Sequence, residues 1–417
     1  MLYKYQKCVI IYSMWGENLK LSLEEIVMLK LINNSISNKN ENIDIQDVDF
    51  EKLFKTVDEH SVNMICFDGV SNLKDSLPQN VYFDWMYFAS RKMTNNEKLI
   101  KVQNKLTSLL EQNSIKYFVF KGLTFASYYQ KPELRELGDI DYYVDYSDFK
   151  TVNSILKEDG FVLTNTKDSK HWSYVYDDIE LEMHFGFWDM PDNDCSNFLI
   201  NYLKNSVSNT KDFSRDDYIF KGTNPVSSAI IHLLHIINHM QAGGIGLRHI
   251  CDYAVFLNSD DFKNNYQEII SVYKKGGIYK TAQIVMYICE NYLSAPHYEA
   301  TENVDTKLCE LLLKDIITSG NFGRLSEETY HGSAVFTLDK SENSSFLNSL
   351  FTFCKLSWKP CEKYKILLPI APFYIGTRYV FRALAGKRPK INPLKYTKEG
   401  LHRADLYKKL DFFKKES

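Results

Sequence analysis

The sequence predicts an α+β fold, in which a small mixed β-sheet core is flanked by N-terminal and C-terminal helical regions. Apolar residues recur with helical periodicity before about residue 95 and again after about residue 224. Between these regions, short β-branched and aromatic runs alternate with helical segments, which is typical of strands in a sheet. The composition, with 44% hydrophobic and 25% charged residues and only 10 prolines, is that of a globular protein.

The chain of 417 residues is long enough for about two or three domains. We expect a helical region at residues 1–94, an α/β core at 95–190, a helical domain at 191–330, and a loop with a basic helical tail at 331–417.

The N-terminal region contains three predicted helical stretches. Residues 19–32 have helical periodicity, and Ser22 and Glu25 have the spacing of a capping box. Residues 51–67 form a second amphipathic stretch, and residues 85–112 are expected to form one long helix.

The first half of the core is expected to contain two strands and two helices. The apolar run 115–120 predicts a buried strand, and residues 123–130 predict a two-turn helix. Residues 140–144 predict the second strand. Ser147 can cap the helix that follows, and Gly160 lies where a C′ glycine belongs.

Three further strands are expected at residues 161–164, 172–176 and 179–185, and the last two are joined by a turn at Asp177-Asp178. The resulting β-α-β-α-β-β-β order implies a mixed sheet with helices on one face.

The C-terminal region is expected to be helical again. Packed helices are predicted at residues 225–240, 247–257 and 279–292, and residues 319–345 are expected to form a loop before the basic tail.

The tail carries a marked excess of positive charge. From Thr352 to Ser417 there are 16 lysines and arginines against 5 acidic residues, a charge of +11, so the rest of the chain must carry −14 to give the total of −3. Two interpretations remain open: a solvated helical surface, or a surface that attracts anionic lipid, nucleic acid or an acidic partner. No specific nucleic-acid motif accompanies the charge. Salt-sensitive contact with an anionic membrane is therefore kept as a hypothesis.

A reduced, cytoplasmic protein fits the remaining composition best. Eight cysteines are scattered without C-x-x-C spacing, which predicts neither a zinc ribbon nor a disulfide framework. The apolar run 366–376 contains two prolines and is about half the length of a membrane span.

Asp139-Ile-Asp141 is the central candidate for chemistry. Carboxylates at positions i and i+2 of a strand point to the same side, a few ångströms apart. Like charges this close are unfavourable unless a cation lies between them, and Mg²⁺ (or Mn²⁺) is a hard cation that takes oxygen ligands. By itself the pair is weak evidence, because solvated acids at a strand end show the same pattern.

Neighbouring residues favour phosphate binding. Gly138 would let a substrate approach closely. Lys121-Gly122 follows a buried strand and opens a helix, so backbone N–H groups, the helix dipole and the ammonium group would together attract a phosphate. Arg135 lies in the intervening loop, where its guanidinium is free to reach a triphosphate.

A third carboxylate is expected from the strand at 179–185. Strict alternation in Ile179-Glu-Leu-Glu-Met-His-Phe places Glu180, Glu182 and His184 on one face of this strand. Either glutamate could be the third metal ligand, and the Glu-hydrophobic-His pattern favours Glu182. Glu180 and His184 would then not bind the metal themselves but would lie next to its ligands, where His184 can orient a carboxylate or a phosphate.

Together these motifs resemble the uncharacterised bacterial nucleotidyltransferase family of the DNA-polymerase-beta-type superfamily. The resemblance is carried by Phe118-Val-Phe-Lys-Gly-Leu, Arg135-Glu-Leu-Gly-Asp-Ile-Asp-Tyr-Tyr-Val and Leu181-Glu-Met-His-Phe. It covers residues 95–190 strongly and extends weakly into the flanking helices, including residues 232–257. It implies a nucleotidyltransferase core that moves a nucleoside monophosphate from an NTP to an acceptor hydroxyl with the help of Mg²⁺.

The resemblance also implies roles for particular residues. Asp139, Asp141 and Glu182 would be the metal ligands of a two-metal mechanism, and Gly122 would be the glycine of the phosphate turn. The chain departs from the wider superfamily at this turn, because Lys121-Gly-Leu-Thr stands where Gly-Ser or Gly-Gly-Ser is usual. Members of the family are associated with polysaccharide synthesis, so the unknown acceptor could be a sugar or a polysaccharide precursor. A catalytically weak nucleotide-binding or interaction protein that keeps the fold is the main alternative function.

Histidines on the predicted helix 225–240 offer a competing site. His232, His235 and His239 share one helix face at i, i+3 and i+7. We interpret them as lining a packed or polar groove, with contact to the nucleotide or acceptor, or a metal site as in phosphohydrolases, as alternatives.

Arg248 and Asp252 lie four residues apart on the predicted helix 247–257, so we expect them to pair with each other. A role for them in the active-site cleft is the alternative.

Overall fold

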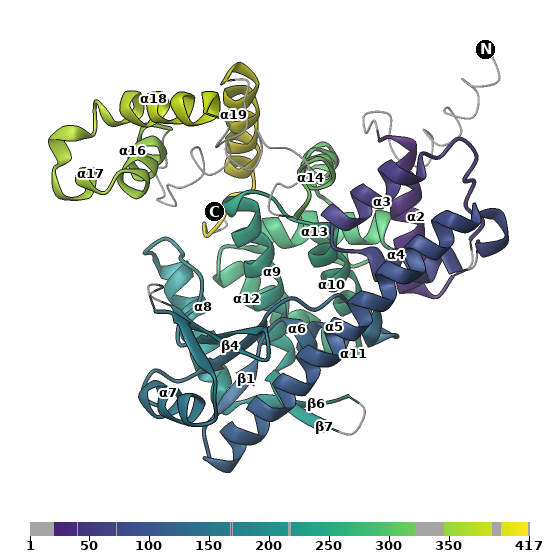
Figure 1. Cartoon of the computed structure of the whole chain (residues 1–417), viewed down its shortest axis with the longest axis horizontal. Coiled ribbons are helices and arrows are strands. Elements are labelled where there is room, and N and C mark those ends of the chain that lie inside the picture. Colours follow the sequence, from purple (N-terminus) through teal and green to yellow (C-terminus); the bar gives the residue numbers. More distant parts are fainter. Residues whose placement is uncertain are drawn as a thin grey trace.

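The structure, a computed structural model, describes residues 21–39, 41–71, 73–166, 168, 170–215, 218–321, 346–385 and 393–415. One mixed sheet lies among helices that come from both ends of the chain (Figure 1). The predicted α+β class with helical flanks is thereby confirmed.

Four helices form the N-terminal region: α2 (Leu23–Ser37), α3 (Phe50–Glu59), α4 (Asn63–Ser71) and, after a 3-10 turn, the long helix α5 (Gln79–Gln112). The capping box of α2 is confirmed, since the Ser22 N–H donates to Glu25 Oε2 (2.6 Å) and the Glu25 N–H donates to Ser22 Oγ (3.4 Å). The stretch predicted at 51–67 is divided into α3 and α4, because Ser61 has a φ of 55°, outside the helical region.

Seven strands form the sheet: β1 (Tyr117–Val119), β2 (Ile140–Val144), β3 (Val162–Asn165), β4 (His171–Tyr176), β5 (Ile179–His184), β6 (Thr210–Arg215) and β7 (Tyr218–Thr223). Their order is β3-β4-β5-β2-β1-β7-β6. β2 pairs with β5 in parallel and with β1 in antiparallel orientation, and β1 pairs with β7 in parallel. The five strands expected from the sequence are all present.

The hairpin of β6 and β7, and helix α8 (Asp194–Asn205) before it, were not predicted. β6 has the sequence Thr-Lys-Asp-Phe-Ser-Arg, and its one large apolar residue, Phe213, gives no alternating signal. The Phe213 ring stacks on Phe220 of β7 with 5.7 Å between centroids. It also covers Gly222, where an added Cβ would lie 2.6 Å from the ring. The hairpin can therefore pack in this way only because residue 222 has no side chain.

The two core helices, α6 (Gly122–Ala126) and α7 (Phe149–Glu158), differ in detail from expectation. α6 is shorter than the predicted helix at 123–130. α7 has Asp148 at its N-cap, and the predicted cap, Ser147, bonds instead to Asp145 Oδ1. Gly160 has a φ of 91°, and the Phe161 N–H donates to the Leu156 carbonyl, which confirms a C′ glycine.

Helices cover both faces of the sheet, whereas the order of elements suggested one face. Tyr117, Val119 and Tyr142 pack with α5 and α7 in one hydrophobic cluster. Phe118 and Tyr143, the alternate residues, belong to a second cluster with α8 and the C-terminal helices. All residues of β1 and β2 are buried, because these strands lie in the middle of the sheet and both of its faces are covered.

The C-terminal helices are α9 (Pro225–Ala242), α10 (Leu247–Asn258), α11 (Asp260–Asn264), α12 (Tyr266–Lys275), α13 (Tyr279–Tyr292) and α14 (Thr306–Ser319). α9, α10 and α13 agree with the predicted helices to within two residues. Apart from Ser319 in α14 and residues 320–321, the predicted loop at 319–345 lies outside the described residues.

The N-terminal and C-terminal helices share one hydrophobic core. At their junction, His60 Nε2 lies 3.1 Å from the Ile317 carbonyl of α14, and the Leu247 N–H of α10 donates to His60 Nδ1 (3.2 Å). The division into four regions stays a prediction.

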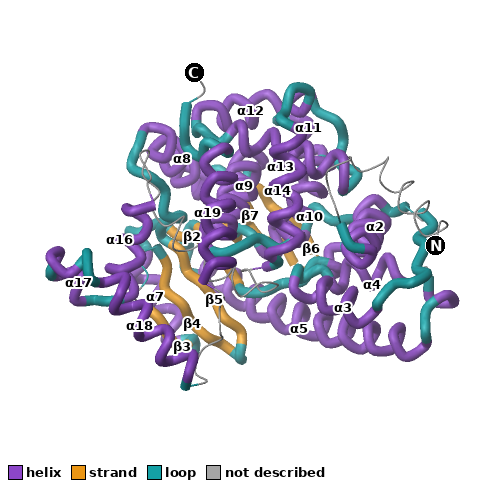
Figure 2. The backbone as a smooth tube through the Cα atoms, turned by 90° about the horizontal axis from the view of Figure 1, so that it is seen from above, coloured by secondary structure: helices purple, strands orange, loops and turns teal. Residues whose placement is uncertain are grey.

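The tail is helical where it is described: α16 (Phe346–Ser357), α17 (Pro360–Lys363), α18 (Ala371–Leu384) and α19 (Pro393–Lys409). α19 returns to the body, where Arg403 pairs with Asp315 of α14 (2.8 Å). α16, α17 and α18 lie to one side of the molecule in both views (Figures 1 and 2). Within the described ranges, no helix is both long and apolar enough to cross a membrane.

Candidate metal and phosphate site

Three chain segments meet at one end of β1, β2 and β5. β1 leads through Phe120 to Lys121, which precedes α6, and β2 begins directly after Asp139. The parallel register of β2 and β5 sets Asp141 opposite Glu182. One carboxylate oxygen from each of Asp139, Asp141 and Glu182 lies within 4.8 Å of the others. The fold thus brings together the three acids singled out in the sequence.

Lys121 and His184 contact the acidic cluster directly. The Lys121 ammonium pairs with Asp141 Oδ1 at 2.7 Å, and His184 Nε2 lies 3.0 Å from the same oxygen and 3.1 Å from Glu182 Oε2. Lys121 is also within 5.6 Å of the Trp188 ring. Lys121, expected to hold phosphate, is therefore in contact with a proposed metal ligand as well.

The pKa values of the carboxyl groups follow from these contacts. Burial raises the pKa of Asp141, but Lys121 and His184 outweigh it and hold the pKa below its ordinary value. Burial also raises the pKa of Glu182, and hydrogen bonds from His171 and His184 outweigh it. The pKa of Asp139 is raised, first by the charge of Asp141 and then by burial. Ionised acids thus crowd a third carboxyl, and a divalent cation would relieve that repulsion.

His171 is a site residue that sequence reasoning missed. Its Nε2 lies 3.3 Å from Glu182 Oε1, and this hydrogen bond is the main cause of its raised pKa. The turn predicted at Asp177-Asp178 could have identified His171, because it sets the pairing of the two strands. Asp177 and Asp178 both have positive φ, 49° and 62°, as in a two-residue hairpin turn, and such a turn places His171 opposite His184.

The backbone at Lys121 is strained. Its φ of 78° and ψ of −154° fall in a region that glycine occupies almost exclusively, at a cost of about 1–3 kcal/mol. Gly122 follows with a φ of 44°. This turn directs the Lys121 side chain to Asp141. Because α6 has only five residues, its dipole is short, and the positive charge at the turn comes mainly from Lys121.

Arg135 does not reach toward a triphosphate as expected. Its Nε and Nη2 donate to the two carboxylate oxygens of Asp252, both at 2.8 Å, and the Tyr129 hydroxyl donates to Asp252 Oδ1 at 2.9 Å. The Arg135 and Asp252 side chains are only 4% and 1% exposed. The expectation that Asp252 pairs with Arg248 is wrong for the same reason: the carboxylate is already bonded in a bidentate manner.

Arg248 is the cation that remains near the acids. Its Nη1 donates to the Glu136 carbonyl at 3.2 Å, its Nε has no hydrogen-bond partner, and no carboxylate among the described residues forms an ion pair with it. Burial lowers its pKa, with a further contribution from Arg135, while Asp252, Glu136 and Asp139 raise it. A half-buried guanidinium without a carboxylate partner is suited to bind an anion.

The remaining predicted residues lie around the acids. Gly138 borders open space, since an added Cβ would meet nothing within 4 Å, and the same Cβ on Gly122 would approach the Asp139 carbonyl at 3.9 Å. Glu180 is exposed on β5 and is not among the described groups close enough to share a metal, whereas Glu182 is. The geometry therefore favours Glu182 as the third carboxylate.

The histidines of α9 are buried behind the acids. His232 stacks on Phe125 with 3.5 Å between centroids. His235, His239 and His249 form a cluster whose ring nitrogens lie close enough to hold a metal, and His235 Nε2 is 2.9 Å from His239 Nε2. Burial lowers the pKa of all three imidazoles, and Arg248 lowers it further. Neutral, packed imidazoles beside a cation agree with the interpretation of a polar groove.

Comparison with known proteins gives one match. A family model described as an uncharacterised nucleotidyltransferase matches residues 46–294, from the loop before α3 to the residues after α13. No curated protein matches the chain.

Proposed function

Because the chain belongs to this family of uncharacterised nucleotidyltransferases, we propose that its acidic cluster transfers a nucleoside monophosphate from an NTP to an acceptor hydroxyl. The observation that carries the proposal is the convergence of the Asp139, Asp141 and Glu182 carboxylates beside Lys121. Oxygen ligands of this kind suit Mg²⁺ or Mn²⁺. When bound, the metal supplies a Lewis acid that stabilises phosphoryl charge and favours ionisation of the attacking hydroxyl.

In this mechanism the protein positions the groups that react. Asp139, Asp141 and Glu182 would hold the metal ions, and His171 and His184 orient the carboxylates through their hydrogen bonds. The acceptor oxygen forms a bond to the α-phosphorus as the bond from that phosphorus to the bridging oxygen breaks. The hydroxyl proton passes to solvent, and pyrophosphate leaves.

Arg248, together with Lys121, is proposed as the cation that steadies the triphosphate. Arg135 cannot serve without breaking its pair with Asp252, whereas Arg248 has no carboxylate partner in the described part of the chain. The open space beside Gly138 offers room for a substrate group next to Asp139. The acceptor is proposed to be a sugar or a polysaccharide precursor, an assignment that rests on the family resemblance alone.

Two substitutions test the chemistry. Asp139→Asn and Asp141→Asn should each abolish the metal-dependent transfer of label from α-labelled NTPs to an acceptor in cell extract. Glu180→Gln is the matched control, because it removes one negative charge from the same face of β5 without touching the cluster. Activity retained in either aspartate variant, with full thermal stability, would refute the mechanism.

The alternative function is a nucleotide-binding protein without turnover. Calorimetry distinguishes it: Mg²⁺-NTP would bind to the wild type and weakly to Arg248→Gln, yet no pyrophosphate would appear with any acceptor.

A further inference from the structure

The residues from 364 to 384 expose an unusual number of large apolar side chains. Eight of the sixteen exposed large hydrophobic residues in the described chain lie in this short stretch. Single exposed apolar residues are common on proteins, but a concentration of this kind marks an interaction surface. The eight are Tyr364, Ile366, Ile370, Phe373, Tyr374, Val380, Phe381 and Leu384.

On α18 these residues form one continuous outward face. Phe373, Val380 and Leu384 are 78%, 55% and 73% exposed, and their spacing of seven and four residues places them on one side of the helix. Phe381, at the edge of this side, is 73% exposed. The opposite side carries Ala371, which is buried against α16 and α17. We call the outward face, with Phe373, Val380, Phe381 and Leu384, the α18 apolar face.

The α18 apolar face belongs to a small helical unit with a core of its own. Cys354, Cys361 and Ala371 are fully buried there, and Leu350 and Trp358 pack against them. Among the described elements, α16 has its main contacts with α17 and α18, and α18 has its main contacts with α16. The unit lies beside the body, away from the sheet in Figure 1. The inner side of α18 is therefore already used to hold the unit together, and the outer side is available.

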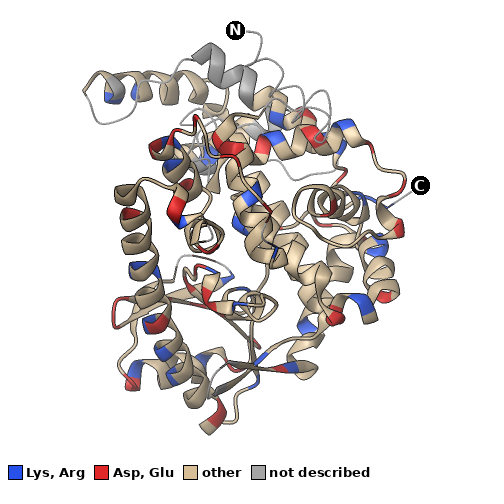
Figure 3. Ribbon diagram, turned by 90° about the vertical axis from the view of Figure 1, so that its right-hand side faces the viewer, with Lys and Arg blue, Asp and Glu red and all other residues tan. Residues whose placement is uncertain are grey.

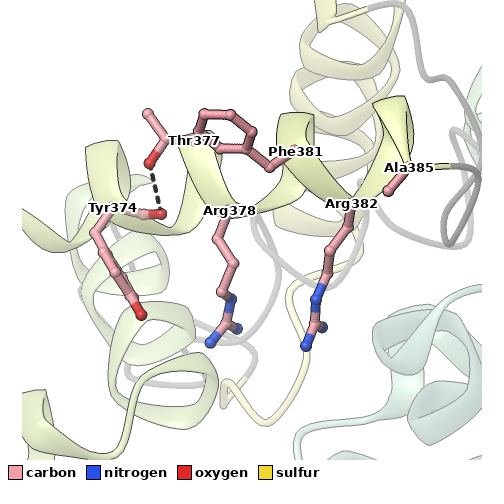
Figure 4. Close-up of a pocket in the computed structure, with 6 residues that line it drawn as sticks. All are labelled: Tyr374, Thr377, Arg378, Phe381, Arg382 and Ala385. Carbon is pink, nitrogen blue, oxygen red and sulfur yellow. Dashed lines mark hydrogen bonds between the residues drawn. The ribbon is translucent and has the colours of Figure 1, made fainter.

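The segment that carries the apolar face is strongly positive. Between Glu362 and Glu399 the sequence has nine lysines and arginines and no acidic residue. α18 itself carries Arg378 and Arg382, so its ribbon is tan and blue in Figure 3. Figure 4 shows both guanidinium groups on one side of the helix and the Phe381 and Thr377 side chains on the other, so these two arginines add charge to the unit from the side opposite the α18 apolar face.

We propose that the α18 apolar face docks on the surface of an anionic membrane. Large apolar side chains would enter the boundary between headgroups and acyl chains, while the exposed Lys363 and Lys365 beside them and the net positive charge of residues 363–398 attract anionic headgroups. No described helix could span a bilayer, so the contact would be peripheral. The unit lies outside residues 46–294, so the proposed docking is a property of this chain beyond the family match.

Vesicle flotation of the full chain tests the proposal. The protein should float with vesicles of phosphatidylcholine and phosphatidylglycerol at low salt, less at high salt, and little with phosphatidylcholine alone. Phe373→Ser/Phe381→Ser should weaken partitioning roughly a hundredfold, because each buried phenylalanine contributes at least about tenfold. The matched control is Phe83→Ser/Tyr87→Ser on α5, where both side chains are also exposed, and it should float like the wild type.

A second pair of variants tests the charge. Lys363→Gln/Lys365→Gln, next to the exposed Tyr364 and Ile366, should weaken flotation at low salt. Lys98→Gln/Lys101→Gln on α5 should not, although it removes the same charge from exposed positions. Trp358, which stacks on Tyr374 at 4.3 Å, offers an independent fluorescence signal on binding. The proposal is overturned if the protein ignores anionic vesicles at low salt. It is equally overturned if Phe373→Ser/Phe381→Ser floats unchanged, or instead converts a dimer to a monomer, since a second copy would then cover this face.

Discussion

The buried pair of Arg135 and Asp252 gives a prediction whose size follows from the contacts. Arg135→Met leaves the Asp252 carboxylate buried with only the Tyr129 hydroxyl, and Asp252→Leu leaves the Arg135 guanidinium buried without a counter-ion. Each single change should cost about 3–5 kcal/mol of unfolding free energy, as is usual when one partner of a buried ion pair is lost.

The double variant should recover most of that loss. With both charges replaced, the main remaining defect is the unpaired Tyr129 hydroxyl, which should cost about 1–3 kcal/mol. The coupling between Arg135 and Asp252 should therefore be at least about 3 kcal/mol. Urea unfolding followed by circular dichroism measures all three variants, and Arg91→Met, at an exposed position of α5, should stay within about 0.5 kcal/mol of the wild type.

One result would refute this reasoning. If Arg135→Met unfolds at the wild-type urea concentration and binds Mg²⁺-NTP weakly, then Arg135 contacts phosphate, as its place in the sequence suggests, and the pair with Asp252 is not what holds it.

Three further predictions concern stability and access to the site. Burial lowers the pKa of His60 to about 4, so the neutral form that accepts from the Leu247 N–H is favoured in the folded state. His60 therefore contributes its full stabilisation above the unfolded-state pKa of about 6.5, and this contribution declines as the pH falls. At pH 5 the free energy of unfolding measured with urea should be roughly 2 kcal/mol lower than at neutral pH, and His60→Gln should not show this loss. Gly222→Ala should lower stability by about 1–3 kcal/mol, because Phe213 must move; an unchanged melting temperature would contradict this. Gly138→Ala should leave the melting temperature unchanged and lower kcat/KM for the NTP; unchanged kinetics would mean that no substrate group approaches this glycine.

Hydrophobic periodicity and boundary residues predicted individual helices and strands well. The strand at 140–144 and the helix at 279–292 agree residue for residue with β2 and α13, because their periodicity and boundary residues are strong. The acids of the candidate site could also be identified from the sequence, since Asp139 and Asp141 are two residues apart at one predicted strand and Glu182 lies on another predicted strand.

Long-range partners could not be predicted in the same way. Asp252 lies 117 residues from Arg135, and nothing in either segment shows that the carboxylate meets this arginine rather than Arg248, one helical turn away. The β6–β7 hairpin was missed because its stability depends on Phe213 crossing Gly222, a contact that leaves no periodic pattern.

Arg403 of α19 fastens the end of the basic tail to the body of the protein. Its guanidinium donates to the Gly243 carbonyl at the end of α9 (2.8 Å) and pairs with Asp315 of α14, so the segment after α18 is fastened to the body. The unit of α16 to α18 is therefore an insertion held at both ends, and not a free tail. Replacing residues 346–385 by a flexible linker should leave both attachment points intact. A protease cut within the insertion should likewise yield two fragments that stay together until the protein unfolds.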